Sequence, residues 1–204
     1  MVSKPCSLFI LVFMSKTIFI IPGFKTQVKD PLYSELVTYL KSRDYVVQAV
    51  PITWNNKTVS QNAIEFVRYF NENKGNSNYV LGFSYGAVIA LMTAEIVDTK
   101  KLILCSLSPD FKEDSNAMPT WLIKYIGKNR FADTLTRSAN KFAKKLTVET
   151  IVFYGEKEGI DYPQLKIRSE QTAKLAPNSK LIVIKDAPHD ISFPTYVEAI
   201  KKVF

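Results

Sequence analysis

The chain alternates short apolar runs with segments whose apolar residues recur at helical spacing, and no other feature limits the fold as much. Runs such as 17–21 and 150–154 consist almost wholly of apolar residues, which is typical of strands buried on both faces of a sheet. Strands that alternate with helices predict parallel pairing through right-handed crossovers. We therefore expect a three-layer α/β/α sandwich around a six-stranded, mostly parallel sheet. The predicted strands are 17–21, 45–50, 79–81, 101–107, 150–154 and 180–184.

A helical segment is expected after each of these strands. Asp30 and Pro31 predict a helix start, because a capping residue followed by proline favours the first helical turn. Residues 110–146 are expected to form a small helical cap inserted into the domain. Residues 14–204 then form one domain, and residues 1–13 are predicted to be an N-terminal extension that contributes little to function. The other predicted helices are 58–73, 87–97, 164–175 and 196–203.

The cysteine and histidine content argues against a metal site. The chain has two cysteines, Cys6 and Cys105, and a single histidine, and these residues cannot supply a zinc ligand set. Cys105 lies in an apolar run, as expected of a reduced thiol in a protein core. We therefore predict a cytoplasmic protein that holds no metal. The apolar segment 7–14 is too short to span a bilayer, so stable membrane insertion is not expected.

The net charge of +8 raises the question of an anionic partner. Residues 128–145 contain six basic side chains and one acidic side chain. Phe131, Leu135 and Phe142 recur there at roughly helical spacing, which predicts one amphipathic helix with a solvated basic face. The alternative is a surface that attracts anionic substrates or lipid headgroups. No recognised nucleic-acid-binding motif accompanies these residues, so no nucleic-acid partner is expected.

The segment from Gly82 to Gly86 reads G-x-S-x-G and stands between a predicted strand and a predicted helix. This is the pattern of a nucleophile elbow. A turn this sharp strains the serine backbone, and side chains larger than hydrogen at the two glycines would collide with neighbouring elements. Ser84 is therefore predicted to be a nucleophile. The alternative is a tight turn that happens to carry a serine.

A base and an acid are expected at the ends of later strands, because open α/β sheets place their sites at the carboxyl ends of the strands. His189 follows the sixth predicted strand, and no other imidazole is available to take the proton of Ser84. A carboxylate after the fifth strand would hold the imidazole tautomer. Glu158 is the predicted acid and Asp161 the alternative, and either could instead be a solvated charge in the loop 155–161.

Acyl transfer also needs two backbone N–H donors where negative charge develops on the substrate oxygen. One donor is expected from Tyr85, the residue after the nucleophile. The other is expected from the loop after the first strand, where Phe24 follows Pro22 and Gly23. Taken alone, that loop would be an ordinary turn that ends a strand.

Together these motifs resemble the α/β-hydrolase superfamily, and most closely its compact serine hydrolases. Small bacterial esterases and retinoblastoma-binding-protein-9-like hydrolases are examples of such members. The resemblance rests on 21–24, 82–86, 155–158 and 189–190. It implies the strand order 2-1-3-4-5-6 and a triad in the chain order serine, acid, histidine.

Three features depart from that family's usual pattern. The leading antiparallel strands are missing, unless residues 8–13 supply one. Glu158 stands where aspartate is more common. Pro22 stands where the first loop usually carries a histidine.

The sequence thus favours a serine hydrolase that needs no cofactor and cleaves a carboxylic ester or thioester of a small-molecule acyl substrate. A peptidase or amidase using the same triad is one alternative, and a non-catalytic binding scaffold is another. Trp121 and Tyr125 are the candidate substrate-binding residues. The alternative for this aromatic-rich stripe is packing of the cap against the sheet. The oligomeric state is not indicated by the sequence.

Overall fold

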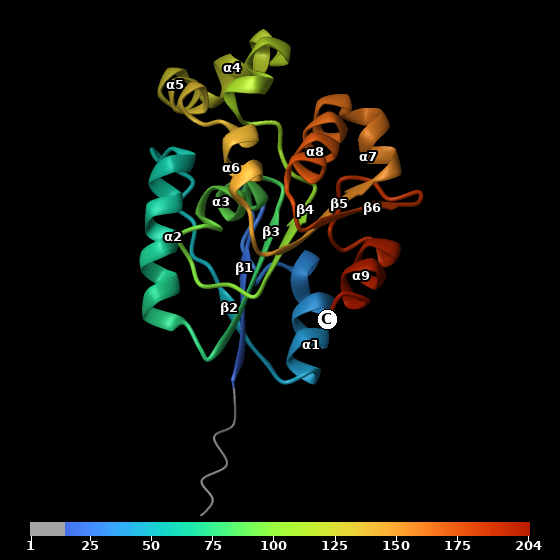
Figure 1. Cartoon of the computed structure of the whole chain (residues 1–204). Coiled ribbons are helices and arrows are strands. Elements are labelled where there is room, and N and C mark those ends of the chain that lie inside the picture. The colour runs from blue at the N-terminus through green and yellow to red at the C-terminus, as the bar shows by residue number, and fades with distance from the viewer. Residues whose placement is uncertain (1–14) are drawn as a thin grey trace, which may run out of the picture.

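The computed structural model describes residues 15–204, and the predicted strands form one parallel sheet (Figure 1). The order across the sheet is β2-β1-β3-β4-β5-β6, which confirms both the fold class and the strand order implied by the resemblance. The possible leading strand in 8–13 and the proposed extension 1–13 lie outside the described residues. The strands are β1 (Lys16–Ile21), β2 (Tyr45–Ala49), β3 (Ser77–Phe83), β4 (Lys101–Cys105), β5 (Glu149–Gly155) and β6 (Ser179–Ile184).

Helices cover both faces of the sheet (Figure 1). One face packs against α2 (Val59–Asn73), α3 (Tyr85–Thr93), α6 (Ala139–Lys145) and α8 (Pro163–Leu175). The other packs against α1 (Ser34–Ser42) and α9 (Pro194–Lys201). The helix expected to start at Asp30 and Pro31 begins with a 3-10 turn, η1 (Pro31–Tyr33), and becomes α-helical at Ser34.

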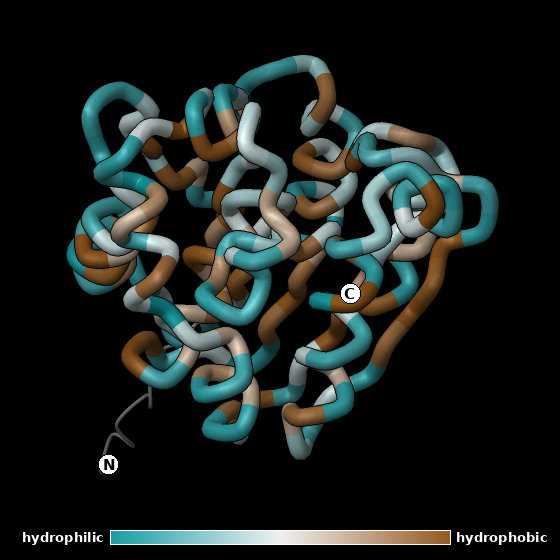
Figure 2. Tube along the Cα trace, turned by 90° about the horizontal axis from the view of Figure 1, so that it is seen from above, coloured by the Kyte–Doolittle hydropathy of each residue, from teal (hydrophilic) through white to brown (hydrophobic). Residues whose placement is uncertain are grey.

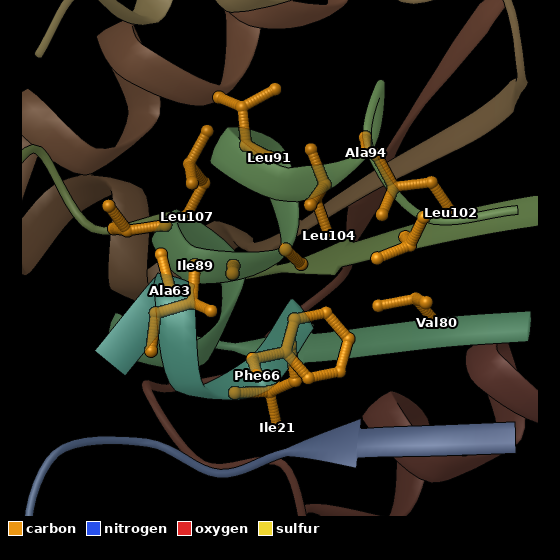
Figure 3. Close-up of a cluster of buried hydrophobic side chains, with 14 of the residues drawn as sticks. Ile21, Ala63, Phe66, Val80, Ile89, Leu91, Ala94, Leu102, Leu104 and Leu107 are labelled. Atoms are coloured by element: carbon orange, nitrogen blue, oxygen red, sulfur yellow. The ribbon is translucent and has the colours of Figure 1, made fainter. Parts of the chain in front are cut away.

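The central helix α3 is apolar on all sides because it is enclosed by the sheet and by α2. Its residues from Gly86 to Leu91 are all buried. Figure 3 shows Ile89 of this helix among Phe66 of α2 and Leu104 of β4, all of them buried. Each such side chain stabilises the fold by about 1.5–3 kcal/mol relative to exposure. Seen from above, several hydrophobic stretches run through the interior and most of the outer turns are hydrophilic, although one hydrophobic stretch also lies along an outer edge (Figure 2).

The inserted cap contains four short helical segments. The first two are η2 (Lys112–Ala117) and α4 (Thr120–Ile126), and α5 (Lys128–Thr136) and α6 follow. Figure 1 shows α4 and α5 above the ends of the strands. No helix among residues 15–204 has the length and apolar character needed to cross a membrane.

The prediction of a single amphipathic helix over 128–145 is wrong, because the helix is interrupted between α5 and α6. Arg137 is in an extended conformation there and only 2% of its side chain is exposed. Its guanidinium forms ion pairs with Asp110 and Asp133, and Ser138 accepts a hydrogen bond from the backbone N–H of Lys141 at the start of α6. Burial of a paired arginine therefore replaces the solvated basic face at this position.

A second buried ion pair joins the cap to α8. Arg168 of α8 and Asp114 of η2 are almost fully buried, and an Arg168 Nη2 lies 2.7 Å from Asp114 Oδ1. The Arg168 Nε–H also lies 3.1 Å from both carboxylate oxygens. Burial raises the pKa of Asp114, and the bonds from Arg168 partly offset that rise. The position of the cap thus depends on charges that are removed from water.

Candidate active site

Ser84 stands on a strained turn between β3 and α3. Its φ of 54° and ψ of −115° are sparsely populated for a residue with a side chain. A Cβ on Gly82 would lie 2.3 Å from the carbonyl oxygen of Gly86, and a Cβ on Gly86 would lie 2.1 Å from that of Ile21. Only glycine fits at these two positions, so the G-x-S-x-G pattern follows from the packing of α3 against β3 and the end of β1.

The side chains of Ser84, His189 and Glu158 form a hydrogen-bonded chain. The distance from Ser84 Oγ to His189 Nε2 is 3.0 Å, and His189 Nδ1 is hydrogen-bonded to Glu158 Oε1. The serine follows β3, the histidine follows β6 and the glutamate follows β5. Three segments far apart in the sequence therefore meet at the carboxyl ends of the parallel strands, as predicted from the position of sites in open α/β sheets.

Glu158 does not lie in a loop, as the sequence suggested, but in a short helix, α7 (Glu156–Asp161). Its carboxylate caps that helix start, since Oε2 accepts a hydrogen bond of 2.8 Å from the Gly155 N–H. The side chain is fully buried. Asp161, the alternative acid, is exposed at the other end of α7 and makes no hydrogen bond to the imidazole.

Ser106 and Tyr196 support the glutamate and were not identified from the sequence. The Ser106 hydroxyl donates to Glu158 Oε2 at 3.0 Å and lies 2.8 Å from the Tyr196 hydroxyl. Burial raises the pKa of Tyr196 well above its ordinary value, so the phenol remains a protonated donor to Ser106. Ser106 directly follows β4, and its place at the end of a strand is the signal that could have identified it.

The imidazole and the nucleophile have further neighbours. The ring of His189 packs near those of Phe83 and Tyr162, with centroid distances of 5.1 and 5.9 Å. The Ser108 Oγ lies 3.1 Å from Ser84 Oγ. If Ser84 donates its one proton to the imidazole, Ser108 must donate to Ser84. Such a contact helps to hold the serine oxygen in place.

The two predicted oxyanion donors lie on segments in direct contact. Among residues 15–204, no acceptor is hydrogen-bonded to the backbone N–H of Phe24 or of Tyr85. The preceding N–H, that of Gly23, donates to the hydroxyl of Tyr33 at 2.9 Å. The Thr26 N–H closes the same turn onto the Gly23 carbonyl at 3.1 Å. The loop is thus fixed by its own hydrogen bonds while the Phe24 donor stays available.

An apolar cavity of about 200 Å³ lies beside the serine. Tyr85, Ser108 and residues of the cap line it, including Met118, Leu122 and Tyr125. Tyr125 is therefore placed on its wall. Trp121 is not on that wall, and 68% of it is exposed. Within the described part of the chain, no cluster of His, Cys, Asp and Glu side chains is arranged to hold a metal ion.

Comparison with protein-family models and with curated proteins finds no match. Solved structures do match. Est1E from Butyrivibrio proteoclasticus superposes with a TM-score of 0.70 and 18% identity, over 93% of this chain and 84% of that one. The Pyrococcus furiosus esterase Pf2001 superposes with a TM-score of 0.68 and 16% identity, over 93% of this chain and 79% of that one. For MenH from S. aureus the TM-score is 0.68 and the identity 16%, over 95% of this chain and 93% of that one. The chain therefore has the α/β-hydrolase fold.

Proposed function

We propose that this chain is a serine hydrolase that cleaves a carboxylic ester or thioester through an acyl-serine intermediate. The observation that carries the proposal is the continuous hydrogen bonding from Ser84 through His189 to the buried Glu158. The unoccupied donors of Phe24 and Tyr85 support it. A structural tight turn would need none of these partners.

In the acylation step, His189 Nε2 takes the proton of Ser84 Oγ as that oxygen attacks the substrate carbonyl carbon. The carbonyl oxygen becomes negatively charged and accepts hydrogen bonds from the Phe24 and Tyr85 N–H groups. Glu158 stabilises the imidazolium that has formed. The imidazolium then gives its proton to the departing alcohol or thiol, and the acyl group remains bonded to Ser84 Oγ.

Deacylation repeats these roles with water in place of the alcohol. His189 takes a proton from the water molecule while its oxygen attacks the acyl carbon. The second tetrahedral intermediate uses the same two N–H donors. When it collapses, the proton returns to Ser84 Oγ and the carboxylic acid leaves. Substrate and one water molecule balance these steps, and the proton transfers use only His189.

The size and character of the cavity beside the serine favour a small or medium acyl group. Its walls are mostly apolar side chains of the cap, and its volume of about 200 Å³ fits a short acyl chain. One of the similar proteins described above, Pf2001 from Pyrococcus furiosus, is an esterase by name. These points favour an ester over an amide as the substrate.

Covalent labelling with a fluorophosphonate probe tests the nucleophile. We expect the wild-type protein to label on the peptide that contains Ser84, and Ser84→Ala to remain unlabelled. Ser108→Ala is the matched control, since Ser108 is the neighbouring hydroxyl within hydrogen-bond distance, and its adduct should still map to Ser84. A folded wild-type protein that does not label would instead favour the binding scaffold.

Hydrolysis assays separate the two enzymatic alternatives. Turnover of p-nitrophenyl butyrate without turnover of the matching p-nitroanilide is expected of an esterase. The reverse preference, with aminoacyl amides cleaved faster than aryl esters, would assign the same triad to a peptidase or amidase.

A further inference from the structure

A second, larger cavity adjoins the apolar cavity beside Ser84. Its volume is about 610 Å³. The two cavities share four lining residues, Phe24, Tyr125, Ile126 and Arg130. The second cavity is formed by the loop after β1, the segment before α2 and the junction of α4 with α5. The two cavities are therefore direct neighbours.

All the charged side chains that line this second cavity are basic. Lys25, Lys57, Lys128 and Arg130 line it, and no aspartate or glutamate does. Lys57 forms an ion pair with Glu65. Lys25, Lys128 and Arg130 have no carboxylate partner among residues 15–204. Three unneutralised cations around one cavity repel each other, and an anion bound between them would relieve that repulsion.

Two of the three cations, Arg130 and Lys25, are held in place by neighbouring groups. The Arg130 guanidinium donates to the backbone carbonyl of Lys57 at 3.0 Å and to that of Trp54. Lys25 Nζ donates to the Tyr125 hydroxyl at 2.6 Å. Lys128 is the first residue of α5, so the positive end of that helix adds to the same potential. These positions make a site that is prepared for an anion.

The apolar cavity has fewer charges on its wall, and its one cation is Arg130, which it shares with the second cavity. The acid on its wall, Asp110, is paired with Arg137 at 3.0 Å, and most of the other lining side chains are apolar or aromatic. An acyl chain bound there would run from the Phe24 and Tyr85 donors toward the shared wall at Tyr125. The second cavity, with its cations, adjoins the apolar cavity at that wall.

We propose that the preferred substrate is an ester or thioester whose acyl chain ends in an anionic group, a carboxylate or a phosphate, bound in the basic cavity. The inference rests on the proposed function, because it assigns the substrate class of the same serine. The apolar cavity holds the chain, and Lys25, Lys128 and Arg130 bind its charged end.

Kinetics with matched esters test this substrate class. We expect kcat/KM for p-nitrophenyl hydrogen adipate to exceed that for p-nitrophenyl hexanoate, which has the same chain length and no charge, by about 10-fold at low salt. The ratio should fall as salt rises, because exposed charges are screened. A third ester that ends in a phosphonate distinguishes the two anions, since the better of the two charged esters identifies the natural group.

Two lysine variants assign the effect to the cavity. Lys128→Gln should lower the ratio of charged to neutral ester several-fold. Lys124→Gln is the matched control, because Lys124 is an exposed lysine of the neighbouring α4 that does not line the cavity, and it should leave the ratio unchanged. An equal loss in both variants would indicate only a general effect of net charge and would overturn the proposal.

A binding measurement separates this proposal from the proposed function. Ser84→Ala should bind monomethyl adipate more tightly than methyl hexanoate, whether or not the wild-type protein turns esters over. If Ser84 labels with the probe but a charged end gives no advantage in kcat/KM or in binding, the anion site is refuted and the hydrolase stands. If the charged ester binds preferentially but Ser84 does not label, the hydrolase is refuted and the anion site stands.

Discussion

Replacing Glu158 with glutamine tests the role of the buried acid with the smallest possible change in shape. The two carboxylate oxygens have different partners. Oε2 accepts from the Gly155 N–H and the Ser106 hydroxyl, while Oε1 is bonded to His189. A glutamine has one oxygen and one NH₂ group. Its oxygen will face the two donors, because the opposite orientation would point the NH₂ at the Gly155 N–H.

That orientation directs the glutamine NH₂ toward Nδ1 of His189. Nδ1 must then be unprotonated, so the proton of a neutral imidazole lies on Nε2. A protonated Nε2 cannot accept the proton of Ser84. The variant also lacks the negative charge that stabilises the imidazolium. Loss of both effects lowers kcat by about 10³–10⁴-fold, which equals about 4–5.5 kcal/mol of transition-state stabilisation.

The measurement is kcat for a p-nitrophenyl ester, compared among wild type, Glu158→Gln and Asp161→Asn. Asp161 is exposed on the same helix, so Asp161→Asn should stay within about twofold of wild type, as expected when no contact to the imidazole is lost. Thermal unfolding of each variant checks that the fold is intact. A Glu158→Gln enzyme that keeps more than a tenth of wild-type kcat would refute this reasoning. So would an Asp161→Asn enzyme whose kcat falls as far as that of Glu158→Gln.

Two further predictions concern the fold around the site. Gly86→Ala should destabilise the protein by about 1–3 kcal/mol in urea unfolding and reduce probe labelling, because the new Cβ would lie 2.1 Å from the Ile21 carbonyl oxygen; a change below 0.5 kcal/mol would contradict that contact. Arg168→Met should cost about 3–5 kcal/mol at neutral pH, since Asp114 is left as an unpaired buried carboxylate. Burial raises the folded-state pKa of Asp114. A carboxyl with a raised pKa stabilises the folded state at low pH, and this stabilisation is lost as the pH rises through the folded-state pKa. The variant should therefore recover stability on acidification relative to Arg43→Met, an exposed control, and a pH-independent difference would contradict this assignment.

The strands and the elbow could be predicted because their signals are local. An almost wholly apolar run such as 150–154 has few alternatives to a buried strand, and β5 contains it. The glycines at positions 82 and 86 are visible in the sequence, and in the fold neighbouring backbone atoms leave no room for a Cβ at either position. The meeting of Ser84 with His189 followed from a rule about the ends of parallel strands, and that rule needs only the order of the elements.

Other features depend on contacts between distant segments. The break between α5 and α6 occurs where Arg137 pairs with Asp110, which is 27 residues earlier in the chain. A helical pattern of apolar residues carries no information about such a partner. Helix α7 was likewise not expected, because its start is capped by Glu158, whose side chain appeared to be either a triad acid or a loop charge. Here one carboxylate holds the helix start and the imidazole together.

The same distinction separates the groups proposed for chemistry from those proposed for specificity. Ser84, His189 and Glu158 are fixed by the ends of sheet strands, which the parallel pairing holds in register. Tyr125 and Lys128 belong instead to a cap whose position depends on buried ion pairs such as that of Arg168 with Asp114. A change in one of those pairs can move the walls of both cavities while the triad stays assembled. Substitutions at the pairs should therefore alter the choice between charged and neutral esters more than the labelling of Ser84.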